Sequence, residues 1–468
     1  MMFKTRVLIL PLAIASVLAA CTHPGSVDSG AVSAARESLP VQPITWAAVQ
    51  QETGEVSVGW IAAFKDPVLE KLVTEALQHN RNLQAAAANI EASRALARQA
   101  GAALKPTVGL SAGGQRGGTV NSDAAGSLNV GLQASWELDV WNRIGSGEQA
   151  AVASLEAAQA DYRFSQYSLA AGVAGAYFIA IESELQKNLT RSLVDSVLQT
   201  RRIVETQFRN GLASAQDVAL VKADLATARE GLAAAEGGQR DAIRALELLL
   251  GRYPEAELTL RNSLPALPEP PGAGVPSEVL ERRPDLIAAE RRIAAAMNVT
   301  NQAKAARLPQ ISLTGSVGGS SPQLSSLLNP GNLAWQAATS LLVPLIDGGA
   351  RQAQVEVSTA EQKAAVAAYA QAALVAFSEV ETALDQRLNL QRREASLAQA
   401  TNQSREALRL AKLRFKEGES DLIDVLTVQQ RVDSAQSNHL SLQRAQLQQF
   451  VDLNLALGGD WQTRPAKN

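Results

Sequence analysis

The sequence predicts a mostly helical protein that carries a membrane β-barrel part and consists of two copies of one unit. Three observations support this fold class: a tandem repeat, two strand-like segments in each copy, and a proline-free stretch of helical length after each pair. Each copy is expected to read helix, hairpin, long helix, shorter helix. Function is therefore expected in what the two copies build together.

The repeat is visible at two fixed offsets. Leu83 matches Leu286 and Pro106 matches Pro309, both 203 residues apart. Further along the chain the offset is 207, and it holds for Tyr162 and Tyr369, Phe208 and Phe415, Gly211 and Gly418, Asp217 and Asp424, and Gly251 and Gly458.

The N-terminus has the pattern of a lipoprotein signal. Lys4 and Arg6 precede an apolar run over 7–18, which is too short to span a bilayer. The run ends Leu-Ala-Ala-Cys21, and Cys21 is the only cysteine, so no disulfide framework can form. The pattern resembles bacterial lipoproteins and implies that Cys21 carries a covalent lipid, with Thr22 favouring the outer membrane. The alternative is a chance cysteine after a plain secretory signal.

Each copy contains two segments in which apolar and polar residues alternate. Residues 127–138 are the clearest case, because every second residue is apolar over this length. Segments 106–114 and 310–317, and the one after the Pro/Gly/Ser loop of the second copy, show the same pattern. An ordinary half-buried hairpin would alternate in this way, but strands of about ten residues with an aromatic near the end are also typical of a transmembrane β-barrel.

The long helices are expected over about 145–210 and 350–417, with ends at Gly211 and Gly418, since glycine often terminates helices. Residues seven apart suggest a coiled-coil seam in each helix. The seam positions are Leu155, Tyr162, Leu169 and Ala176 in the first copy, and Ala353, Ala360, Ala367 and Leu374 in the second.

These elements give an expected order of segments along the chain. The chain is expected to start with a signal peptide (1–20) and an N-terminal extended segment and belt (21–63). The first repeat (64–261) has strands at about 106–140, a long helix at about 145–210 and a return helix at about 214–250, and a Pro-rich linker (262–276) follows it. The second repeat (277–459) has strands at about 310–345, a long helix at about 350–417 and a return helix at about 420–457, and a C-terminal tail (460–468) ends the chain.

Four strands per chain constrain the assembly. An open sheet edge cannot face lipid, because its backbone groups would lack partners, so several chains must share one barrel. Two chains would give a barrel filled by side chains, whereas three give twelve strands and leave room inside. Small polar residues such as Ser127, Asn129 and Gln133 suit a water-filled interior. A homotrimer with a pore is the expected assembly.

Composition argues against several other functions. The net charge is −3, so no basic field attracts nucleic acid. His23, His79 and His439 are far apart without metal-ligand spacing, and no phosphate-binding Gly-x-x-x-x-Gly-Lys-Ser/Thr loop occurs. We expect neither an enzyme, nor a metal site, nor any cofactor apart from the lipid on Cys21.

Four segments are distinctive. They are Gly59-Trp-Ile-Ala-Ala-Phe-Lys-Asp-Pro-Val-Leu69, Val275-Pro-Ser-Glu-Val-Leu-Glu-Arg-Arg-Pro-Asp-Leu286, Pro344-Leu-Ile-Asp-Gly-Gly349 and Ala456-Leu-Gly-Gly-Asp-Trp461. Together they resemble the TolC-like outer membrane factor family, of the NodT or OprM lipoprotein type, over about residues 57–461.

That resemblance implies a homotrimer with a twelve-stranded β-barrel in the outer membrane, a long α-helical barrel through the periplasm and a belt around it. It also implies an exit duct of a tripartite efflux pump, whose partners are a periplasmic adaptor and an inner-membrane transporter of the resistance-nodulation-division class. A duct for type I polypeptide secretion and a structural periplasmic coiled-coil lipoprotein are the alternatives. The exported substrate is not encoded in any residue pattern of the chain.

Charged residues cluster where the long helices end. Asp421 and Asp424 follow Gly418, Asp217 has the equivalent place in the first copy, and related family members carry paired aspartates in a constriction at the tip. Rings of carboxylates would favour cations, but acids at a helix N-terminus also act as caps. We expect Asp421 and Asp424 to be either a channel constriction or caps, and Asp217 mainly a cap. The neighbouring cations that could pair with them are Arg209, Arg414 and Lys416.

Overall fold

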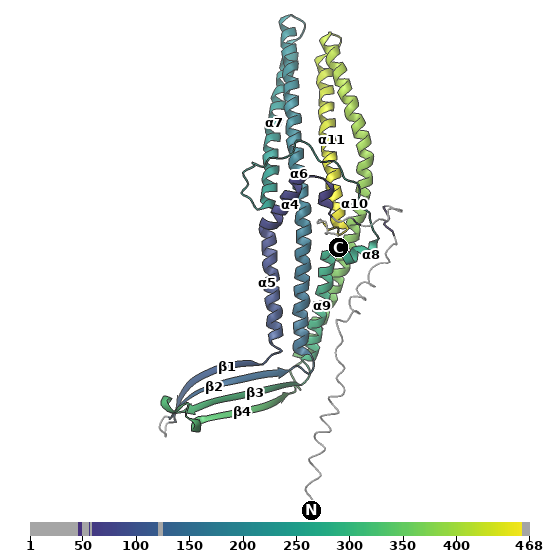
Figure 1. Ribbon diagram of the computed structural model, residues 1–468. Coiled ribbons are helices and arrows are strands. Elements are labelled where there is room, and N and C mark those ends of the chain that lie inside the picture. Colours follow the sequence, from purple (N-terminus) through teal and green to yellow (C-terminus); the bar gives the residue numbers. More distant parts are fainter. Residues whose placement is uncertain (1–44, 49–55, 57–58, 120–124, 461–468) are drawn as a thin grey trace, which may run out of the picture. The chain divides into compact units, whose positions relative to one another are not determined.

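A computed structural model describes residues 45–48, 56, 59–119 and 125–460, which are predominantly helical and include one four-stranded sheet (Figure 1). The chain divides into two compact units. The first includes Arg94–Ser154 and Glu290–Ala368, and the second includes Leu39–Ser93, Leu155–Ala289 and Tyr369–Asn468.

The sheet of the first unit is antiparallel throughout, in the order β1-β2-β3-β4. Its strands are β1 (Thr107–Gly117), β2 (Ala125–Leu138), β3 (Gln310–Ser321) and β4 (Leu333–Leu342), and two 3₁₀ turns, η1 (Leu324–Ser326) and η2 (Pro330–Asn332), lie between β3 and β4. The central pairing of β2 with β3 joins the two copies of the repeat. Period-two alternation thus produces one continuous sheet rather than two separate hairpins.

The turn from β2 into the helix α6 is fixed by one carboxylate. Asp139 accepts hydrogen bonds from the backbone N–H groups of Ile144 (2.9 Å) and Gly145 (2.7 Å), which satisfies two donors that a helix start leaves unpaired. The indole of Trp141 donates to the carbonyl oxygen of Pro309 at 2.7 Å, so the turn is also held to the start of β3.

Two helices of 67 residues, α6 (Arg143–Arg209) and α10 (Ala350–Lys416), follow the strands of each copy. At 1.5 Å per residue each is about 100 Å long. Both are followed by a left-handed glycine, Gly211 (φ 75°) and Gly418 (φ 78°), where a side chain would strain the backbone. The return helices are α7 (Ala215–Leu250) and α11 (Leu422–Ala456), and helices α5 (Arg81–Ala102) and α9 (Pro284–Ala305) precede the two strand pairs.

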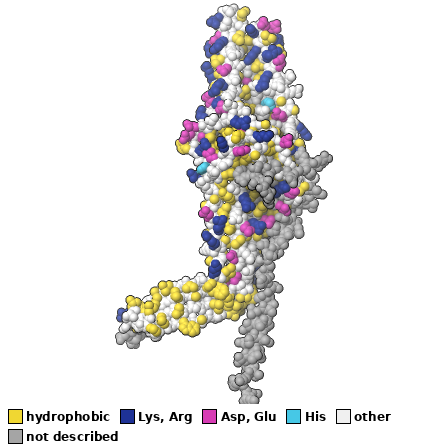
Figure 2. All heavy atoms as spheres, in the orientation of Figure 1, with side chains coloured by type: hydrophobic (Ala, Val, Ile, Leu, Met, Phe, Trp, Pro, Cys, Tyr) yellow, Lys and Arg dark blue, Asp and Glu magenta, His cyan; other side chains and the backbone are white. Residues whose placement is uncertain are grey.

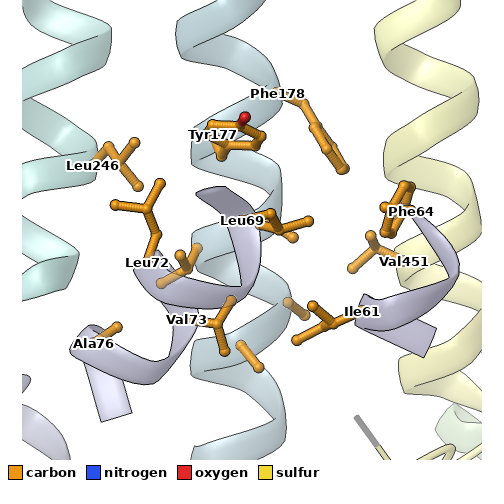
Figure 3. Packing of buried hydrophobic residues seen from close by; sticks show 14 of the residues in the cluster. Ile61, Phe64, Leu69, Leu72, Val73, Ala76, Tyr177, Phe178, Leu246 and Val451 are labelled. Carbon is orange, nitrogen blue, oxygen red and sulfur yellow. The ribbon is translucent and has the colours of Figure 1, made fainter. Parts of the chain in front are cut away.

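The core of the second unit forms where two short helices pack on the long ones (Figure 3). These are α3 (Trp60–Ala63) and α4 (Pro67–His79), and α4 begins at Asp66, whose side chain accepts from Val68 and Leu69 with proline at the first helical position. Their apolar side chains contact residues of α6, α7 and α11 such as Tyr177, Phe178, Leu246 and Val451. A second apolar cluster includes Val204, Val221, Phe415, Leu422 and Val425.

The predicted coiled-coil seam positions are not the residues that are buried within the single chain. The four positions of the first seam are only half-buried, and Ala353, Ala360, Ala367 and Leu374 of the second are exposed. The buried stripes lie elsewhere on the same helices: Ala150, Ala153, Ala157 and Ala160 on α6, and Tyr369, Ala373, Ala376, Val380 and Ala383 on α10. Both stripes keep the three-and-four spacing of helix packing, but alanine fills most positions because small residues let helices approach closely.

One helix in the described part of the chain, α6, contains an 18-residue window with mean hydropathy 1.3, which is long and apolar enough to cross a membrane. Half of that window is buried inside the protein. Core packing around Tyr177 and Phe178 accounts for this apolar stretch.

Residues 252–275 contain no helix or strand, and the helix α8 (Pro276–Arg282) begins with a proline after them. The segment packs on the protein: Leu258, Leu260 and Leu264 contact the core. The buried Trp46 donates its indole N–H to the carbonyl oxygen of Ala273 at 2.9 Å.

Candidate functional site

The sheet presents two chemically different faces. The strand register aligns Leu110, Leu132, Val317 and Trp335 in one row across all four strands. On the opposite face the neighbouring row is Gly109, Gln133, Ser316 and Gln336. Side chains of successive strand residues point to opposite faces, so one face is apolar and the other is small and polar.

The apolar face is uncovered. Trp335 is 80 % exposed, Leu110 73 % and Leu341 64 %, and Figure 2 shows many apolar and few charged side chains over the strands. Exposed apolar surface of this extent marks a membrane or protein contact. The strands of 10 to 14 residues match the length that a tilted strand needs to cross a bilayer.

The outer strands leave two open edges. Within the described residues β1 pairs only with β2, and β4 pairs only with β3. Open edges are not tolerated in hydrocarbon, because unpaired backbone groups there cost several kcal/mol each. The single chain is therefore an incomplete wall, and the missing partners must be strands of other chains.

The acidic residues at the helix ends have different local roles. Asp217 closes a capping box: its carboxylate accepts from the backbone N–H of Ser214 at 2.8 Å, and its own N–H donates to the Ser214 hydroxyl at 3.1 Å. Asp421 holds the cap position of α11 but its side chain makes no cap hydrogen bond, and Asp424 lies in the first turn. Both Asp421 and Asp424 are exposed.

The cations near these ends contact other groups. Arg209 donates to the hydroxyl of Thr206 at 3.2 Å, and Arg414 lies 4.0 Å from the Glu419 carboxylate. Within the described chain neither reaches an aspartate, and Lys416 has no ion pair. Cys21, the predicted lipid site, lies outside the described residues.

A polar chain links α6, α10 and α11 and was not expected from the sequence. The Lys412 ammonium donates to the Ser196 hydroxyl (2.7 Å), which donates to the Gln429 amide oxygen (3.0 Å), and the Gln429 amide donates to Asp433 (3.0 Å). Burial lowers the pKa of Lys412 and raises the pKa of Asp433. Because 216 residues separate Lys412 from Ser196, no local pattern could have revealed the contact.

A second unexpected network surrounds the buried Asp66 carboxylate. The Tyr177 hydroxyl and the Arg261 guanidinium each donate to its Oδ2 atom at 3.0 Å. Burial raises the pKa of Tyr177, and the neighbouring Asp66 charge adds to this. The network ties the segment after α7 to the core. The Asp66-Pro67 pair is typical of a helix start, but no sequence pattern predicts the contacts with Tyr177 and Arg261.

The described residues contain no group of three or more histidine, cysteine, aspartate or glutamate side chains placed to hold a metal ion. The hollows between α10 and α11, and between α6 and α11, are open grooves of about 770 and 380 Å³.

Comparison with known proteins agrees with this geometry. The family model described as outer membrane efflux protein matches residues 72–252 and 275–459. The chain is 30 % identical to the pyoverdine export outer membrane protein OpmQ of Pseudomonas aeruginosa over 96 % of its own length and 97 % of that protein. It is 33 % identical to the outer membrane protein OprJ of the same organism, over 96 % and 95 %.

A solved structure of the outer-membrane channel OprN superposes with a TM-score of 0.83 at 30 % identity, covering 90 % of this chain and 97 % of that one. The family model covers well over half of the chain, and the predicted resemblance is confirmed. The chain belongs to the outer membrane efflux protein family.

Proposed function

We propose that this protein is the outer-membrane exit duct of a tripartite efflux pump, through which small molecules leave the cell passively. The observation that carries the proposal is the four-stranded sheet, which is apolar on one face, polar on the other and open at both edges. The function follows because a wall of this kind encloses an aqueous pore once it closes in a membrane.

The assembly that fits is a homotrimer. Three chains supply twelve strands, with β1 of one copy pairing with β4 of the next, and a barrel of that size leaves a water-filled interior. The helices would continue the pore as an α-helical barrel in the periplasm. Cys21 would add a covalent lipid anchor in the outer membrane beside the barrel.

The partners follow from the same function. A passive duct in the outer membrane needs an energised transporter in the inner membrane and an adaptor that bridges the periplasm. We expect a periplasmic adaptor and a transporter of the resistance-nodulation-division class, since relatives such as OprJ and OpmQ are named as outer-membrane and export proteins. Chromosomal deletion of the adaptor should abolish export while leaving the duct assembled in the outer membrane.

Two measurements test the duct itself. Native mass spectrometry in detergent should give three copies of the acylated chain, and planar bilayers with the purified protein should show discrete conductance steps. A stable monomer that retains its β-sheet signal and conducts no ions would overturn the proposal.

The tip aspartates are proposed as the constriction of this duct. Support comes from the exposed carboxylates of Asp421 and Asp424, and from the missing cap hydrogen bond of Asp421. Replacing both with alanine should raise single-channel conductance and weaken cation preference, because a ring of carboxylates attracts cations. Conductance and selectivity equal to wild type would restrict both residues to a role at the helix start.

A further inference from the structure

The polar face of the sheet carries a single formal charge. In the four strands the only ionisable residues are Arg116 and Glu137. Arg116 pairs with Gly126, in register with the apolar face, whereas Glu137 pairs with Ser312 on the polar face. Glu137 is thus the one charge that this wall directs toward the polar side.

Arg143, the first residue of α6, forms an ion pair with Glu137. Arg143 donates from Nε to Glu137 Oε1 at 3.1 Å, and from Nη2 to Oε1 and Oε2 at 2.8 Å each. A forked contact of this kind is the most directional that an arginine makes with a carboxylate. Asp139 caps the same helix start, so the backbone that carries Arg143 is held in place.

The corresponding turn of the second copy lacks this contact. There Asp347 accepts from the backbone N–H groups of Gly349 (3.0 Å) and Arg351 (3.3 Å), and Arg351 pairs with Asp347 itself at 3.4 Å. When the two turn aspartates Asp139 and Asp347 are aligned, Leu345 takes the place of Glu137. The strand-to-helix turn is therefore built without a strand carboxylate, so the turn itself does not require the Glu137–Arg143 pair.

Glu137 and Arg143 also line a hollow of about 540 Å³ at the foot of the strands. Its other polar lining includes Thr107, Ser135 and Lys105. The Lys105 ammonium has no ion-pair or hydrogen-bond partner in the described part of the chain, so the three charges around the hollow sum to one positive charge.

We propose that Arg143, which neutralises Glu137, and Lys105, which adds a positive charge, together set the ion selectivity of the duct at the end of the barrel next to the helices. This inference rests on the proposed function, because it requires the polar face to line a trimeric pore. In the trimer, Lys105, Glu137 and Arg143 of the three chains form a ring with three net positive charges. Exchanging Arg143 and Lys105 for neutral residues reverses it to three negative charges.

The test is the reversal potential of purified trimers in planar bilayers under a potassium chloride gradient. It should be run near 0.01 M salt, where the screening length is about 30 Å and wall charges reach across the lumen. For the double variant Lys105→Gln/Arg143→Gln we expect the K⁺/Cl⁻ permeability ratio to rise on the order of threefold, since six positive charges are removed around the lumen and the net charge changes sign. Glu137→Gln should shift the ratio toward chloride.

Two further variants separate charge from structure. Arg116→Gln removes a cation from the opposite face of the same sheet and should leave the ratio unchanged. The swapped pair Glu137→Arg/Arg143→Glu keeps both the pair and the net charge, and should conduct with wild-type selectivity. Native mass measurement of each variant establishes that the trimer is intact.

An unchanged permeability ratio in both the double variant and Glu137→Gln, in conducting trimers, would overturn the inference and leave the duct standing. If the wild-type protein forms no channel, the proposed function as a duct is refuted instead. If the double variant fails to assemble, the opposite shift in Glu137→Gln decides: a shift toward chloride supports the inference, and none refutes it.

Discussion

Replacing Tyr177 with phenylalanine removes a single hydroxyl from the centre of the protein. The ring of Tyr177 is fully buried, and its hydroxyl donates to the fully buried Asp66 carboxylate at 3.0 Å. Phenylalanine fills the same space, so no cavity is created. The change isolates one hydrogen bond to a buried charge.

The expected loss of stability depends on the hydrogen bonds that the Asp66 carboxylate retains in the variant. A hydrogen bond to a charged group contributes roughly 1.5 to 3 kcal/mol to the free energy of unfolding. The carboxylate retains Arg261 (3.0 Å) and the backbone N–H groups of Val68 (3.0 Å) and Leu69 (3.4 Å), so it is not left without partners. We therefore expect the lower half of that range, about 2 kcal/mol.

Denaturant unfolding in detergent, followed by far-ultraviolet circular dichroism, measures this loss as a lower midpoint at unchanged slope. Arg261→Gln is the matched comparison, because that side chain is 39 % exposed and its ion pair should contribute at most about 1 kcal/mol. Equal losses for both variants, or a Tyr177→Phe loss below about 0.5 kcal/mol, would refute the assigned hierarchy.

The same residue predicts a pH dependence. Burial and the Asp66 charge raise the pKa of Tyr177 above its unfolded value near 10. A raised folded pKa gives stability that is complete below the unfolded pKa and is lost as the pH rises through the folded one. The difference between wild type and Tyr177→Phe should therefore shrink above about pH 10. A difference that stays constant up to pH 11 would contradict this origin.

Three further predictions concern other parts of the chain. Ser214→Ala breaks a complete capping box and should cost about 1 kcal/mol in denaturant unfolding, whereas Asp421→Ala removes no cap hydrogen bond and should cost clearly less; equal costs would contradict the assignment. Burial raises the pKa of Asp224, so the stability that this residue contributes is complete below its unfolded pKa and is lost at higher pH. Asp224→Asn should therefore raise the denaturant midpoint of unfolding at pH 7 and leave it unchanged near pH 3. A lower midpoint at pH 7 would refute this. Cys21→Ser should abolish labelling by a palmitate analogue, and persistent labelling would place the lipid elsewhere.

The fold class could be predicted because its signals are local. Alternation with period two and glycine after each long helix lie within short windows of sequence, and the repeat at fixed offsets shows that the same local signals occur twice. The residues buried within the chain differ from the predicted seam positions, because burial depends on which helix face meets a neighbour. In an alanine-rich helix several faces look equally apolar, and heptad spacing alone cannot choose among them.

In the candidate site, too, local patterns could be predicted from the sequence, whereas contacts between distant residues could not. The Ser214–Asp217 capping box spans four residues, and the sequence predicted the capping role of Asp217. The Asp66–Tyr177–Arg261 and Lys412–Ser196–Gln429 contacts join residues far apart in the chain, so only the folded structure reveals them. The Glu137–Arg143 pair is close in sequence, but its meaning depends on the register that places Glu137 alone on the polar face.

The two faces of the sheet differ in bulk as well as in polarity. At the centre of the β2–β3 pairing, Gly131 opposes Gly318 on the polar face, and a Cβ built on Gly318 would lie 2.7 Å from the Gly131 Cα atom. Leu132 and Val317 fill the next row on the other side. At this pair the polar surface has no side chains and the apolar surface beside it has large ones, so the two faces of the sheet differ most in volume at the junction of the two copies. One glycine of this pair comes from each copy of the duplication. At this junction neither glycine can gain a side chain unless the other strand moves away, so a substitution at either position depends on the backbone that faces it.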